Sequence, residues 1–483
     1  MKTPASESRQ LPQTKISSRE SFVLAEQTAR STARWWWLVV SASLGFTIIL
    51  MMVMPAIRGK DASTALAMTV HGHIARLFKR TGYDSWLPML KAARRHATDT
   101  PATPYAVFFD GQAKFQYPPT ALLLVEWLPK KLVDEALQKW DGSVLQLWSG
   151  WFCRLMVFIT IGLSVALAHS VLKPLSDQTK ISARNSTWLT IAIIAAGLSF
   201  YPFVVGHELG QIQVALNALM AAALLFFVRG NKILAGVCIG LCCLVKPQYG
   251  LILVWSLLRR ENRLSAGLFF TVITIVPVSC IYYGWAAYVD YLKVLGILAK
   301  QGEVYWYNQS VNGLLHRFID PSAAYYFDNV GSPLPPYRWV VHYVSSGVAA
   351  AMILLALLPK MGKYSRASLV DLAIVMVVAT IASPVAWNHH YGVLFPVVVA
   401  ILSTVLACRR RKKTLAWLLT AAYLAISTEI VGPEFMFRSR WLGVLASHIF
   451  FGGVLLLIVL WIVKAQSTKA DSLAAVVPGR NLF

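Results

Sequence analysis

Twelve apolar stretches dominate this sequence of 483 residues, and most of them are long enough to cross a lipid bilayer. A membrane-spanning helix needs about 20 predominantly apolar residues. In lipid, backbone polar groups have to bond to one another, which only helices and closed barrels allow. We therefore expect an all-α polytopic membrane protein with about 12 transmembrane helices. The predicted spans are 35–56, 145–171, 186–205, 210–228, 232–246, 248–258, 264–285, 341–359, 367–384, 391–408, 414–431 and 442–464.

The composition supports contact with lipid rather than with nucleic acid. Hydrophobic residues make up 57% of the chain and charged residues only 14%, whereas soluble domains carry about 25% charged residues. The net charge of +23 on a soluble protein would suggest a nucleic-acid partner. Here the basic residues lie mostly between apolar stretches, so we expect the lipid bilayer as the partner and no nucleic acid.

The basic residues also predict the orientation. With alternating spans, the short loops on one side carry sixteen Lys and Arg residues, and those on the other side carry three. Because basic loops stay cytoplasmic, both termini are expected in the cytoplasm of an inner (plasma) membrane protein. The segments 57–144 and 286–340 then form two long external loops within a membrane domain spanning residues 35–464. The tails 1–34 and 465–483 are polar and are expected to be disordered.

Both external loops contain sequence patterns that are not expected of simple linkers. Apolar residues from Leu66 to Phe78 recur at helical spacing, which predicts an amphipathic helix at the membrane surface. The apolar run 115–128 is too short to span and predicts a re-entrant element. In the second loop, aromatic and amide side chains gather at 305–313; they suit either a sugar-binding surface or an interfacial belt.

Four polar clusters lie at or near membrane depth, where ionisable groups are costly and usually functional. They are Asp84, the segment 206–213, Lys246 at a predicted hairpin break, and the segment 383–391. Alternation places all four on the external side. One carboxylate with nearby Lys, Arg and His suits a base acting on a hydroxyl, with cations stabilising an anionic leaving group. A retaining glycosidase needs two close carboxylates and is not indicated.

No cofactor or metal is expected. The adjacent residues His389 and His390 point to different sides of a helix, so a two-His metal site is not favoured. The six cysteines all lie in apolar stretches without metal-ligand spacing, as expected for small core residues.

In this order, the clusters resemble glycosyltransferase family 87 of the C-type glycosyltransferase superfamily, which includes polyprenyl-phosphate-mannose-dependent α-mannosyltransferases. The likeness runs from about residue 35 to 465, and each motif in it is short. The motifs are Tyr83-Asp84 with Lys91-Ala92-Ala93, Phe115-x-Tyr117-Pro118-Pro119, Gly210-Gln211-x-Gln213, Ala235-Gly236 with Lys246-Pro247, Asn308-Gln309-Ser310-Val311-x-Gly313 with Arg317, and Ser383-Pro384-x-x-Trp387-x-His389-His390.

The resemblance implies a C-type glycosyltransferase fold and an inverting hexosyltransferase, with mannose as the expected hexose. It would use a polyprenyl-phosphate sugar donor and a glycolipid or polysaccharide acceptor of the cell envelope, at the external face. The family's base would correspond to Asp84, with Asp61 as the alternative because it lies nearer the first span. The residues implied to bind substrate are Tyr117, Gln211, Gln213, Lys246, Gln309, Asn312, Arg317, Trp387, His389 and His390. Of these, Lys246, Arg317 and one of the two histidines would hold the lipid phosphate.

Two other functions remain open from the sequence. A transporter or flippase of lipid-linked sugars would explain a broken hairpin with Lys246 at its tip. An envelope glycan ligase or polymerase would use the same location with a lipid-linked oligosaccharide donor.

Overall fold

The computed structural model describes ten stretches of the chain, and all structural statements concern these residues. They are 30–31, 33–45, 48–49, 70–98, 102–176, 183–321, 334–358, 368–407, 413–429 and 439–476. Within them the regular elements are helices, and an isolated β-bridge joins Asn308 to Trp387. Asp61, Leu66 and Cys408 lie outside the described residues, as do most of both tails.

Among the described residues, five helices are long and apolar enough to cross a membrane by length and composition. They are α8 (Val144–Ser176), α14 (Asn262–Gln301), α16 (Trp339–Leu357), the continuous pair η3 (Asn388–Val393) and α18 (Leu394–Ala407), and α22 (His448–Val476). A sixth span results if α9 (Ala183–Leu198) and α10 (Tyr201–Glu208), which meet at a bend of 48°, count as one. The expected number of about twelve stays a prediction.

Shorter apolar helices fill the remaining predicted stretches. They are α11 (Gln213–Val228), α12 (Lys232–Cys243), η1 (Pro247–Gly250) with α13 (Leu251–Leu258), α17 (Leu369–Ile381) and α19 (Lys413–Ser427). Residues 33–45 are helical as well. Each apolar stretch predicted after residue 144 therefore coincides with a helix. The predicted break near Lys246 is present because Pro247 has no backbone N–H to continue α12, which ends at Cys243.

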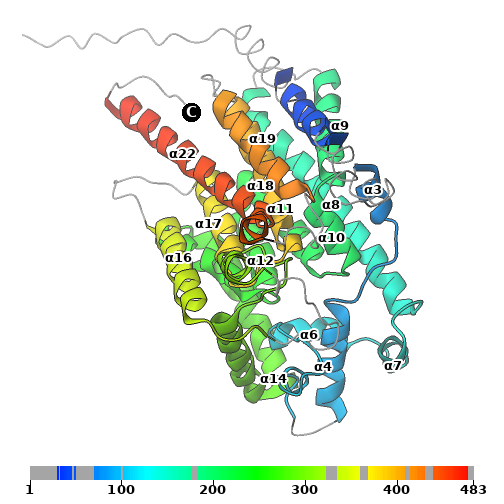
Figure 1. Ribbon diagram of the computed structural model, residues 1–483. Helices are drawn as coiled ribbons and strands as arrows, with labels where there is room; N and C mark the ends of the chain where they lie inside the picture. Colours follow the sequence, from blue (N-terminus) through cyan, green and yellow to red (C-terminus); the bar gives the residue numbers. More distant parts are fainter. Residues whose placement is uncertain are drawn as a thin grey trace, which may run out of the picture.

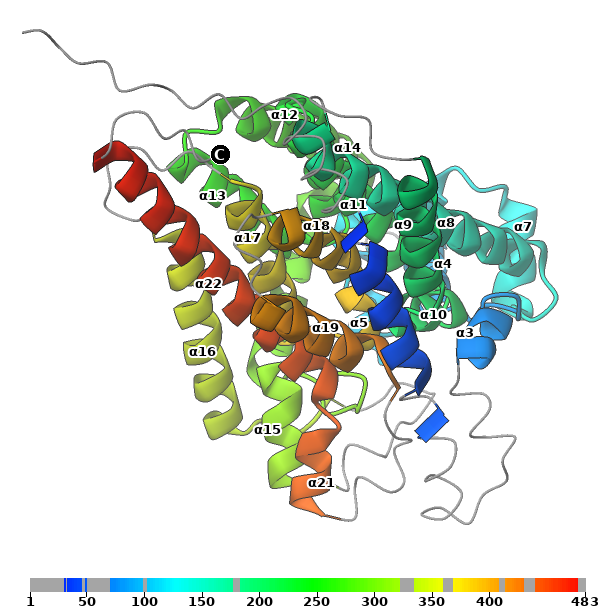
Figure 2. The same ribbon diagram turned by 90° about the horizontal axis from the view of Figure 1, so that it is seen from above.

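Packing between the long and the shorter apolar helices forms the core, and Figure 2 shows the arrangement of these helices from above. The helix α14 packs along α12, α11 packs against both α8 and α12, and α22 packs against α17 and α19. Many apolar side chains of α14 and α16 remain exposed, among them Phe270, Ile281 and Trp339. Such faces need a lipid environment, because soluble proteins rarely expose large apolar patches.

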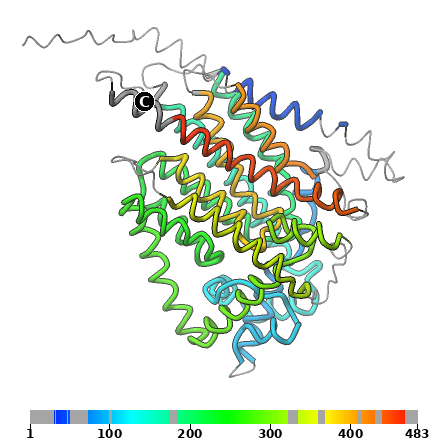
Figure 3. Tube along the Cα trace, turned by 60° about the vertical axis from the view of Figure 1, so that its left-hand side comes forward, coloured from blue at the N-terminus to red at the C-terminus, as the bar shows by residue number. Residues whose placement is uncertain are grey.

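The first predicted external loop consists largely of helices. They are α3 (Val70–Arg76), α4 (Trp86–Thr98), α5 (Ala106–Phe109), α6 (Pro119–Glu126) and α7 (Lys130–Gln138). The helices α4 and α6 lie beside the labelled end of α14 in Figure 1, and the tube in Figure 3 shows the same grouping at one end of the molecule. The described part of the predicted amphipathic helix is α3, and α6 covers much of the predicted re-entrant run.

The helix α14 extends beyond the apolar stretch that predicted it. We expected a span ending near residue 285, but α14 continues to Gln301 after a break at Gly284, whose φ is 73°. Its second half brings Tyr291, Leu295 and Leu298 to the wall of a cavity. Residues 286–301 mix polar and apolar side chains, because one face of the segment is packed and the other is exposed. The sequence therefore did not indicate that the helix continues.

A first junction joins the loop before α4 to the connection between α10 and α11. The Gly82 N–H donates to the Glu208 carbonyl over 2.6 Å, and the Asp84 N–H donates to the Leu209 carbonyl over 2.9 Å. Gly210 has a φ of +66°, and a Cβ on it would lie 2.3 Å from the Gly82 carbonyl oxygen. Only glycine adopts this conformation without strain and permits so close a contact.

A second junction joins residues 303–310 to residues 384–388. The Asn308 side chain donates to the carbonyls of Glu303 and Pro384 and accepts from the Ala386 N–H. The Gln309 N–H donates to the Ala386 carbonyl over 2.7 Å, and the Asn388 N–H donates to the Tyr307 carbonyl over 3.1 Å. These bonds fix the start of the second loop against the turn before η3.

We predict that Gly210→Ala destabilises the protein by about 2–4 kcal/mol, because it adds a left-handed alanine and a clash with Gly82. Gly142→Ala is the matched control, since Gly142 has a φ of +86° with no atoms near its Cβ position. Thermal unfolding of the purified proteins in detergent measures the difference. Equal shifts for both variants would show that the contact between Gly210 and Gly82 contributes nothing.

Candidate active site

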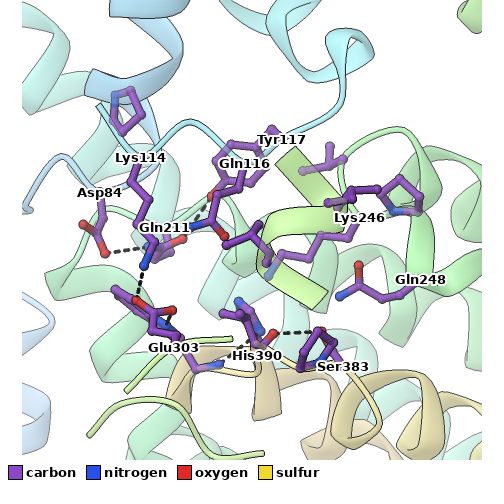
Figure 4. A pocket seen from close by; sticks show the side chains of 18 of the residues that line it. Asp84, Lys114, Gln116, Tyr117, Gln211, Lys246, Gln248, Glu303, Ser383 and His390 are labelled. Atoms are coloured by element: carbon purple, nitrogen blue, oxygen red, sulfur yellow. Dashed lines mark hydrogen bonds and ion pairs between the residues drawn. The ribbon is translucent and has the colours of Figure 1, made fainter. Parts of the chain in front are cut away.

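A cavity of about 670 Å³ lies between the two junctions. Its lining residues come from the first loop, the start of α11, the break after α12, the end of α14, and the turn into η3. Figure 4 shows Asp84, Lys114, Gln211 and Glu303 on one side of the view and Lys246 on the other. The structure thus brings side chains from all four predicted polar clusters to one place.

One arm of the cavity is apolar. It is formed between α13, the second half of α14, α16 and α17 by the side chains of Leu251, Leu295, Leu298, Ile353, Val378, Ala379 and Ala382. A surface of this kind offers no hydrogen-bonding partner and suits a hydrocarbon chain. The cavity as a whole therefore has the polarity of an amphiphile, with a polar head region and an apolar tail region.

Asp84 is held by the first junction and by Gln211. The Gln211 Nε2 donates to Asp84 Oδ2 over 2.8 Å, while its Oε1 accepts from the Ser85 hydroxyl over 2.8 Å. Ser85 in turn accepts from the Ile212 N–H, and its Oγ lies 2.8 Å from the Tyr117 hydroxyl. The amide of Gln211 is thereby fixed in orientation, and so is the carboxylate that it contacts.

The surroundings of Asp84 suit a base that works near neutral pH. Burial raises its pKa to about 6, the hydrogen bond from Gln211 opposes this rise, and the charges of Glu303 and Lys114 raise and lower the pKa respectively. A carboxylate of this pKa is ionised at neutral pH and takes a proton more readily than an ordinary aspartate does.

A second carboxylate, Glu303, lies on the same side of the cavity. It forms an ion pair with Lys114, and its other oxygen accepts from the Trp387 indole N–H over 2.6 Å. The sequence predicted a single carboxylate at this site, but both Asp84 and Glu303 line the cavity. A lone glutamate after a helix carries no distinctive pattern, and only the rarity of acidic residues, 22 in the whole chain, would have drawn attention to it.

Lys246, across the cavity from Asp84, and the two histidines add nitrogen groups to the lining. Lys246 is 8% exposed, and its Nζ has no hydrogen-bonding partner within the described part of the chain. His390 Nδ1 accepts from the Trp387 N–H over 3.2 Å, so its proton resides on Nε2. The ring of His389 lies 4.5 Å from that of His390, centroid to centroid. A buried ammonium without a partner is costly, and an anion would supply its missing acceptors.

Seven of the eleven predicted site residues line the cavity: Asp84, Tyr117, Gln211, Lys246, Trp387, His389 and His390. The cavity is also lined by polar residues that were not among the predicted site residues, namely Lys91, Gln112, Lys114, Gln116, Gln248, Glu303 and Ser383. Lys114 precedes the Phe115-x-Tyr117 motif, Gln116 is the middle residue of that motif, and Gln248 follows Lys246-Pro247, so position in or next to these motifs was a usable signal for them.

The other four predicted residues are buried outside the cavity lining. Gln213 donates to Asn217 within α11, and Gln309 donates to the carbonyls of Trp306 and Ala446. Asn312, in α15 (Val311–Ile319), accepts from the Glu303 N–H. Arg317, in the same helix, donates to the Ser447 hydroxyl over 2.7 Å. In this structure these side chains connect segments of the protein around the cavity.

Comparisons with known proteins agree with this picture. A model of glycosyltransferase family 87 matches residues 115–384, a range that includes Lys246 and Glu303 but neither Asp84 nor the two histidines. The polyprenol-phosphate-mannose-dependent alpha-(1-2)-phosphatidylinositol mannoside mannosyltransferase of Mycobacterium tuberculosis is 26% identical over 317 residues. The match covers 63% of this chain and 65% of that relative, slightly less than two thirds of its length. No solved structure matches the chain.

The family match and the structure point to the same class of protein. The matched segment is more than half of the 483 residues, and it runs through several long apolar helices. This multi-pass membrane protein therefore belongs to glycosyltransferase family 87.

Proposed function

We propose that the protein transfers a hexose, mannose, from a polyprenyl-phosphate donor to a glycolipid or envelope glycan acceptor, with inversion at the anomeric carbon. The observation that carries this proposal is the cavity itself. It combines an apolar arm, an unpartnered buried lysine and a carboxylate of raised pKa. The relative's dependence on polyprenol-phosphate-mannose supports the choice of donor.

The donor would bind with its apolar part in the apolar arm of the cavity and its polar part in the polar region. Its polyprenyl chain would lie along the apolar arm, and its phosphate would accept hydrogen bonds from Lys246 and from the Nε2 of His390. His389 lies beside His390, with 4.5 Å between the two ring centroids. The sugar would then extend toward Asp84 and Gln211.

Asp84 is the better base of the two carboxylates. Both Glu303 oxygens are engaged, by Lys114 and by Trp387. On Asp84, one oxygen accepts from Gln211, and no bond to the other is seen among the described residues. In the reaction, Asp84 takes the proton of an acceptor hydroxyl as that oxygen bonds to the anomeric carbon. The bond from this carbon to the phosphate oxygen breaks, and the polyprenyl phosphate leaves as an anion.

The remaining cavity residues would orient the sugars. Gln211 fixes Asp84, and Tyr117 supports Gln211 through Ser85. Trp387 lies between Glu303 and the histidines, in contact with the rings of Tyr305 and Tyr307, and offers an apolar face to a pyranose. We assign Gln213, Gln309, Asn312 and Arg317 supporting roles around the cavity.

We predict that Asp84→Asn lowers transfer at least about 100-fold, because a general base typically contributes that much or more. The assay follows radiolabel from polyprenyl-phosphate mannose into a membrane glycolipid extract. In the wild type, the rate should fall as the pH drops through about 6, because protonated Asp84 cannot accept a proton. An active Asp84→Asn variant would refute the assignment of the base. Label that never leaves the donor would refute the transferase reaction and favour a transporter.

Lys246→Met should raise the KM for the donor about 10-fold or more, because a charge-assisted hydrogen bond contributes about 1.5–3 kcal/mol. Lys300→Met, at an exposed position near the end of α14, is the control and should leave the KM unchanged. Initial rates at varied donor concentration provide the measurement. An unchanged KM in Lys246→Met would show that the phosphate binds elsewhere.

We further propose that the cavity opens to the external face of the plasma membrane and that both termini are cytoplasmic, as the loop charges indicate. A cysteine replacing Gln138, which is exposed in α7, should react with a membrane-impermeant maleimide on intact cells. A cysteine replacing Asn231, exposed between α11 and α12, should react only after lysis. The reverse pattern would invert the topology.

A further inference from the structure

The ion pair between Lys114 and Glu303 lies on the same side of the cavity as Asp84. Figure 4 shows Lys114 reaching to Glu303 beside the Asp84 carboxylate. Both residues line the cavity, and both act electrostatically on Asp84. Asp84 thus has a cation and a second anion as neighbours.

Several contacts hold Glu303 in one position. Its N–H donates to Asn312 Oδ1 over 3.1 Å, its carbonyl accepts from Asn308, and its carboxylate accepts from the Trp387 indole. The preceding Gly302 has a φ of +67°, and a Cβ there would lie 2.0 Å from Asn312 Oδ1. Backbone and side chain are both restrained, as expected for a group that must hold another in place.

The alternative explanation is that this ion pair only links two loops. For comparison, the ion pair Arg94–Asp134 has side chains that are 36% and 37% exposed. In the cavity pair, Lys114 is 24% exposed and Glu303 only 4%. Burying a carboxylate is costly, and linking two loops does not require it. The burial of Glu303 therefore indicates that the pair acts electrostatically on neighbouring groups.

We infer that Glu303 is a positioning residue for the proposed base: it holds the Lys114 ammonium beside Asp84 and prevents that cation from pairing directly with the Asp84 carboxylate. This inference rests on the proposed function, because it takes Asp84 as the base. Other titratable groups that line this side of the cavity or act on Asp84 electrostatically are Tyr83, Lys91, Tyr117 and Tyr305.

The two partners then affect the base in opposite ways. The negative charge of Glu303 favours protonation of Asp84, and the positive charge of Lys114 opposes it. In Glu303→Gln the pKa of Asp84 should fall, so the acid limb of the pH–rate profile moves to lower pH and the maximal rate decreases. In Lys114→Met the pKa should rise, and the limb moves to higher pH.

The experiment measures pH–rate profiles of the full-length enzyme with radiolabelled polyprenyl-phosphate mannose and the glycolipid extract. We expect the acid limb to shift by about half a pH unit or more in opposite directions in the two variants. The double variant should return close to the wild-type position, and Asp134→Asn, which breaks the exposed pair, should leave the limb in place. Shifts in the same direction, or no shift in either variant, would overturn the inference.

Conservative variants address folding defects. Lys114→Arg and Glu303→Asp keep the charges, so their limbs should remain at the wild-type position even if they are less stable. If Glu303→Gln does not fold, an unmoved limb in Lys114→Met still overturns the inference. An active Asp84→Asn variant would instead refute the proposed function, so the two failures are distinguishable.

Discussion

Two backbone hydrogen bonds, from Gly82 to Glu208 and from Asp84 to Leu209, determine where the proposed catalytic side chain lies. They attach a surface loop to the connection between two apolar helices. Together with the bonds of Ser85 to Gln211 and Ile212, they hold the segment that carries Asp84 against the membrane domain. With them, Gln211 and Asp84 face each other, and the carboxylate is partly removed from water. The raised pKa of Asp84 and its contact with the cavity both follow from this attachment.

The surroundings of the cavity are largely apolar, so each polar contact in it contributes strongly to the interaction energy. In such surroundings charges interact more strongly than in water, and an unpaired polar group is costly. The protein separates its charges accordingly: the carboxylates share one side with Lys114, whereas Lys246 lies across the cavity without a partner among the described residues. An amphiphilic anion would supply the acceptors that Lys246 lacks, and Asp84 would remain free to act on a hydroxyl.

The sequence predicted the positions of helices more accurately than their ends. It predicted the site residues within motifs more accurately than the cavity residues next to them. Apolar runs mark helices because lipid and core both demand them, which is why every predicted stretch after residue 144 coincides with one. The runs do not mark the continuation of α14 to Gln301, where packing and exposure alternate. Motif order predicted a site around Asp84 and Lys246. It could not separate residues that face the cavity, such as His390, from those that brace it, such as Asn312, because both kinds are polar and buried.

The second junction has a consequence for the way the protein is made. Asp84 and Lys114 are synthesised early, but the turn that fixes Glu303 and supplies Trp387 and His390 comes about 300 residues after Asp84. A nascent chain inserted only as far as α16 would carry Asp84, the proposed base, without its indole and imidazole neighbours and without the α17 side chains of the cavity lining. Donor lipid entering such a chain would find no complete site. On the proposed function, transfer would therefore begin only once the α17–η3 turn is in place.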